Sequence, residues 1–170
     1  MRDDIIEEAV SEHGWTYQLV AGHPMTDMFI YTIGLGLNYQ HPELICFGLD
    51  ESLSLEVIQT ACNSIKLGAS FSVGSRHRSL ASHKEFSNRI FVVRPVHETQ
   101  HMFYLGYAMS FYRRSKKTEN LSVVQLIWPD SIGKYPWDAG CNAEVLRQPS
   151  IAAPKTAEEI QEFMDEFGYD

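Results

Sequence analysis

The sequence contains few cysteines, and they lack the spacing of a disulfide framework or a metal-binding motif. Cys46, Cys62 and Cys141 are odd in number and far apart, and no CxxC pair is present. This pattern favours reduced, buried or half-buried thiols in a cytoplasmic protein. No apolar run reaches membrane-spanning length, and the opening stretch MRDDIIEEAV is acidic, so neither a membrane helix nor a signal peptide is expected.

Several common catalytic motifs are also absent. The sequence has no P-loop, no GxGxxG and no nucleophile elbow of the Ser/His/Asp kind. The stretch GLGLN at 34–38 is not expected to cradle a phosphate, because it is short and no helix is predicted after it. These absences remove the enzyme classes that depend on such motifs, and they leave open whether the protein is an enzyme.

The length and composition fit one soluble globular domain. Of the 170 residues, 44% are hydrophobic and 21% are charged. A chain of this length buries a sizeable core but rarely divides into two domains. We expect a single α+β domain over residues 1–148, followed by a linker and an acidic C-terminal helix over residues 149–170.

The net charge of −8, which disfavours general nucleic-acid binding, hides a strong asymmetry. Residues 66–117 carry ten Lys or Arg and two acids, whereas the segments before and after them are strongly acidic. In one interpretation, the acidic ends pack against the basic middle and neutralise it. In the other, basic side chains of the middle segment line a site for an anion such as a phosphate. Those side chains are Arg76, Arg78, Lys84, Arg89 and Arg94.

Local patterns predict six strands and four helices. Alternating, β-branched or wholly apolar stretches predict strands at 15–22, 28–35, 43–49, 69–75, 89–96 and 121–130. Apolar residues at helical spacing predict helices at 3–13, 51–66 and 98–113, and a terminal helix begins after a capping box of Thr156 and Glu159. Short connections between the first three strands imply antiparallel pairing. We therefore expect an antiparallel sheet curled into a partial barrel, with two or three packed helices.

The centres of these elements should form the core. The residues expected to be buried are Ile45, Phe47, Ile58, Val92, Val124 and Leu126. Each lies in an apolar strand or on the apolar side of a helix.

HETQH at 97–101 matches H-E-x-x-H, the zinc-hydrolase motif in which two histidines one helical turn apart hold the metal. The context disfavours this interpretation. Pro95 lies two residues before His97, so His97 falls where the chain is still turning into the helix. A third ligand is also required, and the nearest acid downstream, Glu119, lies in a polar loop. We therefore expect no bound metal. In the alternative, His97 and His101 are two ligands of a zinc ion.

Two other stretches carry candidate binding residues. In YTIGL and the HPEL turn, Tyr31, Thr32 and His41 could face a ligand, with His41 and Glu43 as an acid–base pair; otherwise these residues only shape a bend. In WPD…YPWD, two tryptophans could form a platform for a planar ligand or an anchor for a partner protein. The alternative is a loop whose aromatic residues close one end of the core.

We expect these stretches to meet at one end of the sheet and to form a single concave patch. Its residues are Tyr31, Thr32, His41, Trp128, Asp130 and Trp137. If the ligand is anionic, Arg76, Arg78 and Arg94 should border the patch.

The segments FIYTIGL, HPELICFGL, FVVRPV…YLGYAMSFY and VVQLIWPD…GKYPWD together resemble a bacterial family known only as domain of unknown function 4262. The resemblance covers about residues 15–140 and implies a compact cytoplasmic domain without an assigned activity. A weaker similarity of element order links the chain to flavin-binding split barrels. That analogy implies FMN as an alternative cofactor. The basic segment would then bind the FMN phosphate, and Trp128 or Trp137 would contact the flavin ring.

The sequence thus favours a small acidic cytoplasmic binding domain that contacts a protein partner or a small ligand, without a membrane and without a cofactor. An immunity- or antitoxin-like role is one form of this prediction. The alternative is an enzyme or cofactor binder, either of the flavin type or, through HETQH, of the zinc type.

Overall fold

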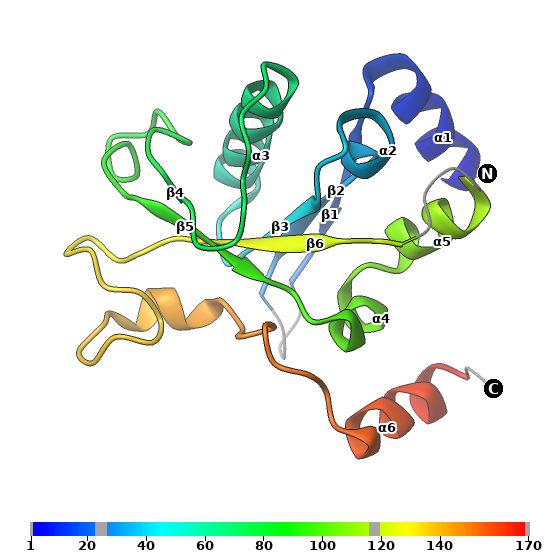
Figure 1. Cartoon of the computed structure of the whole chain (residues 1–170). Coiled ribbons are helices and arrows are strands. Elements are labelled where there is room, and N and C mark those ends of the chain that lie inside the picture. Colours follow the sequence, from blue (N-terminus) through cyan, green and yellow to red (C-terminus); the bar gives the residue numbers. More distant parts are fainter. Residues whose placement is uncertain (1, 23–26, 116–119, 169–170) are drawn as a thin grey trace.

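The protein is built on one open β-sheet with helices on both sides. The computed structural model describes residues 2–22, 27–115 and 120–168, and within them it has six α-helices and six strands. Figure 1 shows α3 (Glu51–Lys66) on one side of the sheet, and α4 (His101–Tyr104) and α6 (Ala157–Phe167) on the other. The predicted α+β class is confirmed.

The sheet is mixed, with one parallel pair at its centre. Its strands lie in the order β1-β2-β3-β6-β5-β4. Their bounds are Thr16–Val20, Phe29–Ile33, Glu43–Phe47, Val123–Ile127, Phe91–Pro95 and Arg76–His77, in that order. All neighbouring pairs are antiparallel except β3 and β6, because the chain returns to β3 only after a long crossover. β1 and β4 are the edges, so the sheet is not closed, and the expected curl into a partial barrel is not confirmed.

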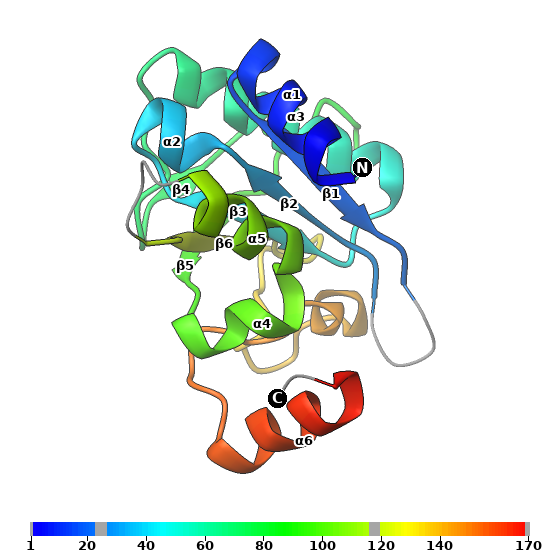
Figure 2. The ribbon, with the colours of Figure 1, turned by 90° about the vertical axis from the view of Figure 1, so that its right-hand side faces the viewer.

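The core lies on both faces of the central strands. All residues of β2, β3 and β6 are buried, as expected for strands covered on two sides. On one face they pack against α3; on the other they pack against α1 (Arg2–His13) and α5 (Gly106–Ser115). Figure 2 shows α1 and α5 in front of the sheet. The six predicted core residues are confirmed, with at most 8% of any of them exposed.

Residues 69–75, predicted as a strand, do not form one. Arg76 and His77 form a two-residue edge strand on β5. Just before it, the Gly74 N–H donates to the Val93 carbonyl at 2.8 Å and the Ser75 carbonyl accepts from the Val93 N–H at 3.0 Å. The preceding segment is held by other contacts: the Phe71 N–H donates to His41 Nε2 at 2.9 Å, and Gly74 turns the chain with a φ of 86°. Phe71 is therefore buried without joining the sheet ladder, whereas Val73 is 58% exposed.

The helix predicted over 98–113 is broken into three pieces. A 3-10 turn, Glu98–Gln100, precedes α4, and Leu105 separates α4 from α5. Leu105 is fully buried, and Gly106, a poor helix former, follows it. The break lets the chain change direction while Leu105 stays in the core.

A short helix, α2 (Leu35–Tyr39), follows β2, where no helix was predicted. Gly34 precedes it with a φ of 108°, a backbone conformation that glycine adopts without strain. The helix has only five residues, too few for a hydrophobic period to appear in the sequence.

The C-terminal segment is tied to the domain further along than residue 148. Ile151 is 2% exposed, its carbonyl accepts from the His97 N–H at 2.9 Å, and the Gln125 side chain donates to the Pro149 carbonyl. The predicted capping box of Thr156 and Glu159 is confirmed. No residue of α6 is buried, and Figures 1 and 2 place the helix at the periphery. Within the described ranges, every helix is too short or too polar to cross a bilayer.

Candidate functional site

Thr32 takes part in a buried hydrogen-bond cluster around Glu43. The Thr32 hydroxyl donates to Glu43 Oε2 at 2.5 Å and accepts from the Leu44 N–H at 2.9 Å. The Gly34 N–H donates to Glu43 Oε1 at 2.8 Å, and the Tyr112 hydroxyl donates to the same oxygen. Burial raises the pKa of Glu43, and these donors limit the rise. Only 1% of Glu43 is exposed, so the cluster joins β2, β3, α2 and α5 from the inside.

Tyr31 and His41, the two residues predicted to flank Thr32 in the site, are also buried. Tyr31 is 1% exposed, and burial raises the pKa of its hydroxyl to about 12. His41 Nδ1 lies 2.7 Å from the Pro42 carbonyl, and Nε2 accepts from Phe71, so the proton resides on Nδ1. Burial lowers the pKa of His41, which favours the neutral ring. His41 and Glu43 use different partners, so the expected acid–base pair is not formed.

Trp128 and Asp130 stabilise the loop that follows β6. Trp128 is 2% exposed, and its indole N–H donates to the Phe47 carbonyl at 2.8 Å. Asp130 is 1% exposed and accepts from the backbone N–H groups of Ile132, Lys134 and Asn142 at 2.8 to 3.0 Å. Burial opposes the charge on Asp130, but these donors outweigh it and hold its pKa below the usual range. Trp128 therefore offers no free face to a ligand, and the Asp130 carboxylate is occupied by backbone donors.

The structure does not bring Thr32 and Trp128 to one pocket. Thr32 bonds to Leu44, which pairs with Val124 in the parallel β3–β6 ladder. Trp128 lies four residues beyond Val124, which is about 13 Å along a strand. The two groups thus lie at different ends of the central strands, and the predicted patch is divided.

Trp137 is the exposed member of the predicted set, with 47% of its surface accessible. Its ring stacks on Tyr135 with centroids 5.1 Å apart and planes 9° apart. The guanidinium of Arg94 lies 4.1 Å from the Trp137 ring, and that of Arg76 lies 5.8 Å from the Tyr135 ring. The structure therefore brings together Trp137 and two of the three predicted anion-binding residues; the third, Arg78, is exposed and lines none of the cavities below.

HETQH does not form a metal-binding helix in the described part of the chain. His97 is the N-cap of the 3-10 turn, where its Nδ1 accepts from the Thr99 N–H. His101 is 8% exposed, and burial lowers its pKa. Among residues 2–22, 27–115 and 120–168, no group of three His, Cys, Asp or Glu side chains is placed to hold a metal. Glu119, the third ligand considered, lies outside the described residues.

We expect the purified protein to contain no stoichiometric zinc. His97 Nδ1 already serves as a helix cap, and a catalytic zinc site needs three protein ligands. Elemental analysis of the purified protein tests this expectation. One equivalent of zinc that is lost in His97→Ala would contradict it.

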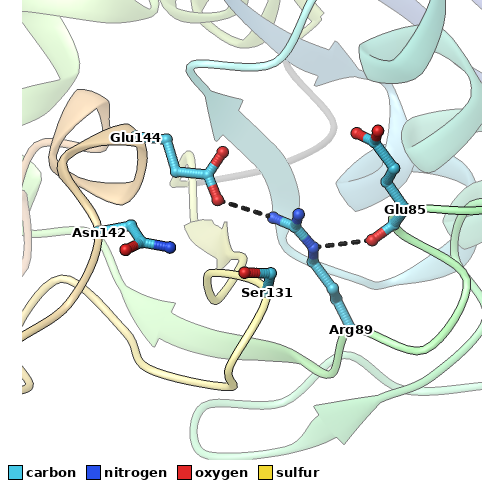
Figure 3. Close-up of a pocket in the computed structure, with 5 residues that line it drawn as sticks. All are labelled: Glu85, Arg89, Ser131, Asn142 and Glu144. Atoms are coloured by element: carbon cyan, nitrogen blue, oxygen red, sulfur yellow. Dashed lines mark hydrogen bonds and ion pairs between the residues drawn. The ribbon is translucent and has the colours of Figure 1, made fainter.

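A hollow of the surface lies around Arg89, beyond the C-terminal end of β6, and we call it the Arg89 depression. It has two parts, with volumes of about 580 and 290 Å³, which share Glu85, Arg89 and Ser131. Figure 3 shows the first part, in which Asn142 and Glu144 face Arg89 and Ser131. The second part is further lined by Arg76, Lys84, Asn88, Ile90, Pro129, Asp130, Gly133 and Tyr135.

Arg89 is fixed at the centre of this depression. Its Nε donates to the Glu85 carbonyl at 2.9 Å, and its Nη1 donates to the Pro129 carbonyl at 3.1 Å and to Glu144 at 3.3 Å (Figure 3). Its guanidinium also lies 4.0 Å from the Phe86 ring, and only 9% of the side chain is exposed. Arg89 therefore links three segments of the chain, and its guanidinium is held in one position at the base of the depression.

Two further cations line the second part of the depression. Arg76 donates to the Tyr135 hydroxyl at 3.4 Å, and neither Arg76 nor Lys84 has a carboxylate partner among the residues that the structure describes. Of the nearby acids, Asp130 is saturated by backbone donors and Glu144 is paired with Arg89, while the exposed Glu85 lines both parts of the depression. This part of the depression thus carries unpaired positive charge suited to an anion.

Sequence reasoning found the basic side chains but missed Ser131, Asn142 and Glu144. Ser131 follows directly after the WPD end of β6, and ligand sites in open sheets with parallel strands gather beyond such C-terminal ends. That rule could have identified Ser131 once β6 was known to be parallel to β3. Asn142 and Glu144 lie in a polar stretch with no pattern of its own.

A model of the family described as Domain of unknown function (DUF4262) matches residues 9–142. This match includes β1 to β6 and most of the Arg89 depression. No curated protein and no solved structure matches the chain.

Proposed function

We propose a function from the geometry of the site, because the chain belongs to the family described as Domain of unknown function (DUF4262), and that description names no activity. In this proposal the protein is a binding domain that recognises an anionic group, a carboxylate or a phosphate, in the Arg89 depression. The anion lies between Arg76 and Lys84, above the fixed guanidinium of Arg89. No catalytic step is part of the proposal.

The observation that carries this proposal is the set of three cations in one hollow, two of them without a carboxylate partner among the described residues. Unpaired charges are costly to gather unless a ligand or counter-ion neutralises them. Tyr135, held by a hydrogen bond from its hydroxyl to the Ile90 carbonyl at 2.7 Å, limits where Arg76 can lie. Because Arg76 is already restricted in the free protein, less side-chain entropy is lost when the ligand binds.

A flavin is not part of the proposal. Tyr135 stacks on the Trp137 ring, the Arg94 guanidinium lies 4.1 Å from the same ring, and Trp128 is buried. An isoalloxazine ring would have to displace Arg94 before it could stack. A yellow colour in the purified protein would favour FMN instead.

Partner binding of the immunity or antitoxin kind is a narrower form of the same proposal. Its support is the small size and the net charge of −8. A cytoplasmic location also belongs here, supported by free cysteines, of which Cys46 and Cys62 are buried. Burial raises the pKa of the Cys46 thiol to about 12.

Inorganic pyrophosphate is a suitable first probe, measured by isothermal titration calorimetry. The double variant Arg76→Gln with Lys84→Gln should bind it about ten- to a hundredfold more weakly, since each exposed charge contributes roughly 1 kcal/mol. The affinity of the native protein should fall as salt is raised.

A matched control removes the same charges elsewhere. Arg113→Gln with Lys66→Gln takes one exposed arginine and one exposed lysine from α5 and α3, and neither residue lines the depression. This variant should bind pyrophosphate as the native protein does. Equal losses in both double variants would show that only net charge matters, and unchanged binding in both would place the site elsewhere.

A further inference from the structure

A second, smaller cleft lies on the other side of the loop that carries Tyr135 and Trp137, and we call it the Trp137 cleft. It has a volume of about 180 Å³. Its polar and aromatic groups come from Arg94, Gln125, Trp137, Gln148 and Ser150. Its apolar walls come from Ile127 and Ile151, among others. It shares no lining residue with the Arg89 depression.

Among the residues that the structure describes, Arg94 is the only charged one that lines this cleft. It pairs with Gln125 in the β5–β6 ladder, so both side chains lie on the same face of the sheet. The Trp137 ring, 4.1 Å away, orients the guanidinium, and no carboxylate among the described residues pairs with it. A guanidinium held against an indole and lacking an acidic partner is suited to a planar carboxylate, which it can bind through two parallel hydrogen bonds.

The remainder of the cleft is suited to an aliphatic group. Ile127 is 5% exposed and Ile151 is 2% exposed, so the walls are firmly packed. The Gln125 amide, 1% exposed, is held by its bond to the Pro149 carbonyl at 3.0 Å. A volume of 180 Å³ equals the space of about six water molecules at roughly 30 Å³ each, which fits a ligand of about six heavy atoms.

We infer that the Trp137 cleft binds a short-chain aliphatic carboxylate, with the carboxylate on Arg94 and the alkyl chain between Ile127 and Ile151. The ligand is a small amphiphilic acid, and its site is independent of the anion site in the Arg89 depression. Trp137 positions the arginine and covers one side of the bound acid.

Butanoate, with six heavy atoms, is the probe, and its binding is followed by two-dimensional NMR of the ¹⁵N-labelled full chain. The Trp137 indole N–H and Gln125 side-chain resonances should shift saturably with butanoate. Butylammonium, which has the same number of carbon atoms and the opposite charge, should leave them unchanged. Equal shifts with both compounds would overturn the inference, because Arg94 would then play no part.

Two variants complete the test. Arg94→Gln should weaken butanoate binding at least about tenfold, whereas Arg78→Gln, an exposed arginine outside the cleft, should leave it unchanged. The Arg76→Gln and Lys84→Gln double variant should also retain butanoate binding. Unchanged binding in Arg94→Gln would overturn the inference, and so would loss of butanoate binding in the double variant.

Discussion

Glu43→Ala is expected to lower the free energy of unfolding by about 3–5 kcal/mol, the largest effect of any single polar substitution in this protein. The substitution removes a buried acceptor and leaves the donors of Thr32, Gly34 and Tyr112 without their partner. Each buried donor left unsatisfied costs about 1–3 kcal/mol. Denaturant-induced unfolding, followed by circular dichroism, measures the loss.

Two milder variants serve as controls for Glu43→Ala. Glu43→Gln keeps the shape and one acceptor oxygen, so it should cost about 1–2 kcal/mol, and Tyr112→Phe, which removes a single donor, should cost about 1 kcal/mol. If Glu43→Ala proves no more harmful than Tyr112→Phe, then the buried cluster does not stabilise the fold in the way described.

The same cluster predicts a dependence of stability on pH. Burial raises the pKa of Glu43 above its ordinary 4.5, so the folded state holds this proton more tightly than the unfolded state does. The contribution of Glu43 is therefore fully present below pH 4.5 and is lost as the pH rises through the folded pKa. Compared with Glu43→Gln, the native protein should lose stability as the pH rises above 4.5. A relative gain over that range would mean that the donors, and not burial, dominate.

Trp128→Ala should cost about 3–5 kcal/mol, as expected for the loss of a large, fully buried aromatic side chain. The indole packs against Phe86 with ring centroids 5.8 Å apart and closes the core above α3. Its N–H also satisfies the Phe47 carbonyl at the end of β3. Trp128→Ala therefore creates a cavity and leaves a buried carbonyl unpaired. Thermal and denaturant unfolding measure the change.

Trp137 provides the matched comparison. It is the same residue type nine positions further along, but 47% of it is exposed. Trp137→Ala should therefore cost less than about 1.5 kcal/mol, since only part of its area and one stacking contact are lost. Trp128→Phe, which keeps most of the volume, should fall between the two. Similar losses for Trp128→Ala and Trp137→Ala would contradict the assignment of separate structural and surface roles.

Features that depend on neighbouring residues were predictable from the sequence. The apolar strand around Ile45, the helix with Ile58 at its centre and the capping box at Thr156 all appear as predicted. Features that depend on distant contacts were not. No local pattern indicates that β6 pairs in parallel with β3, or that Leu105 interrupts a helix because it is needed in the core.

The candidate site shows the same division. The basic composition of the middle segment pointed to Arg76 and Arg94, which the structure places beside Tyr135 and Trp137, respectively. Composition could not show that Trp128 is buried and Trp137 is exposed. The indole of Trp128 is held by a carbonyl acceptor 81 residues away in the chain. Thr32 was likewise predicted to face a ligand, whereas its hydroxyl serves Glu43 inside the core.

The position of β6 also has a consequence for folding during synthesis. Among the described strands it comes last in the chain, yet it lies between β3 and β5. Until residues 123–127 are made, β3 and β5 both expose unpaired backbone groups, and exposed strand edges promote aggregation. If translation stops just before β6, the edges of β3 and β5 that β6 would cover both stay open. The loss of an edge strand, by contrast, would only make the sheet one strand smaller. Such nascent chains should depend on chaperones far more than chains that stop within α6.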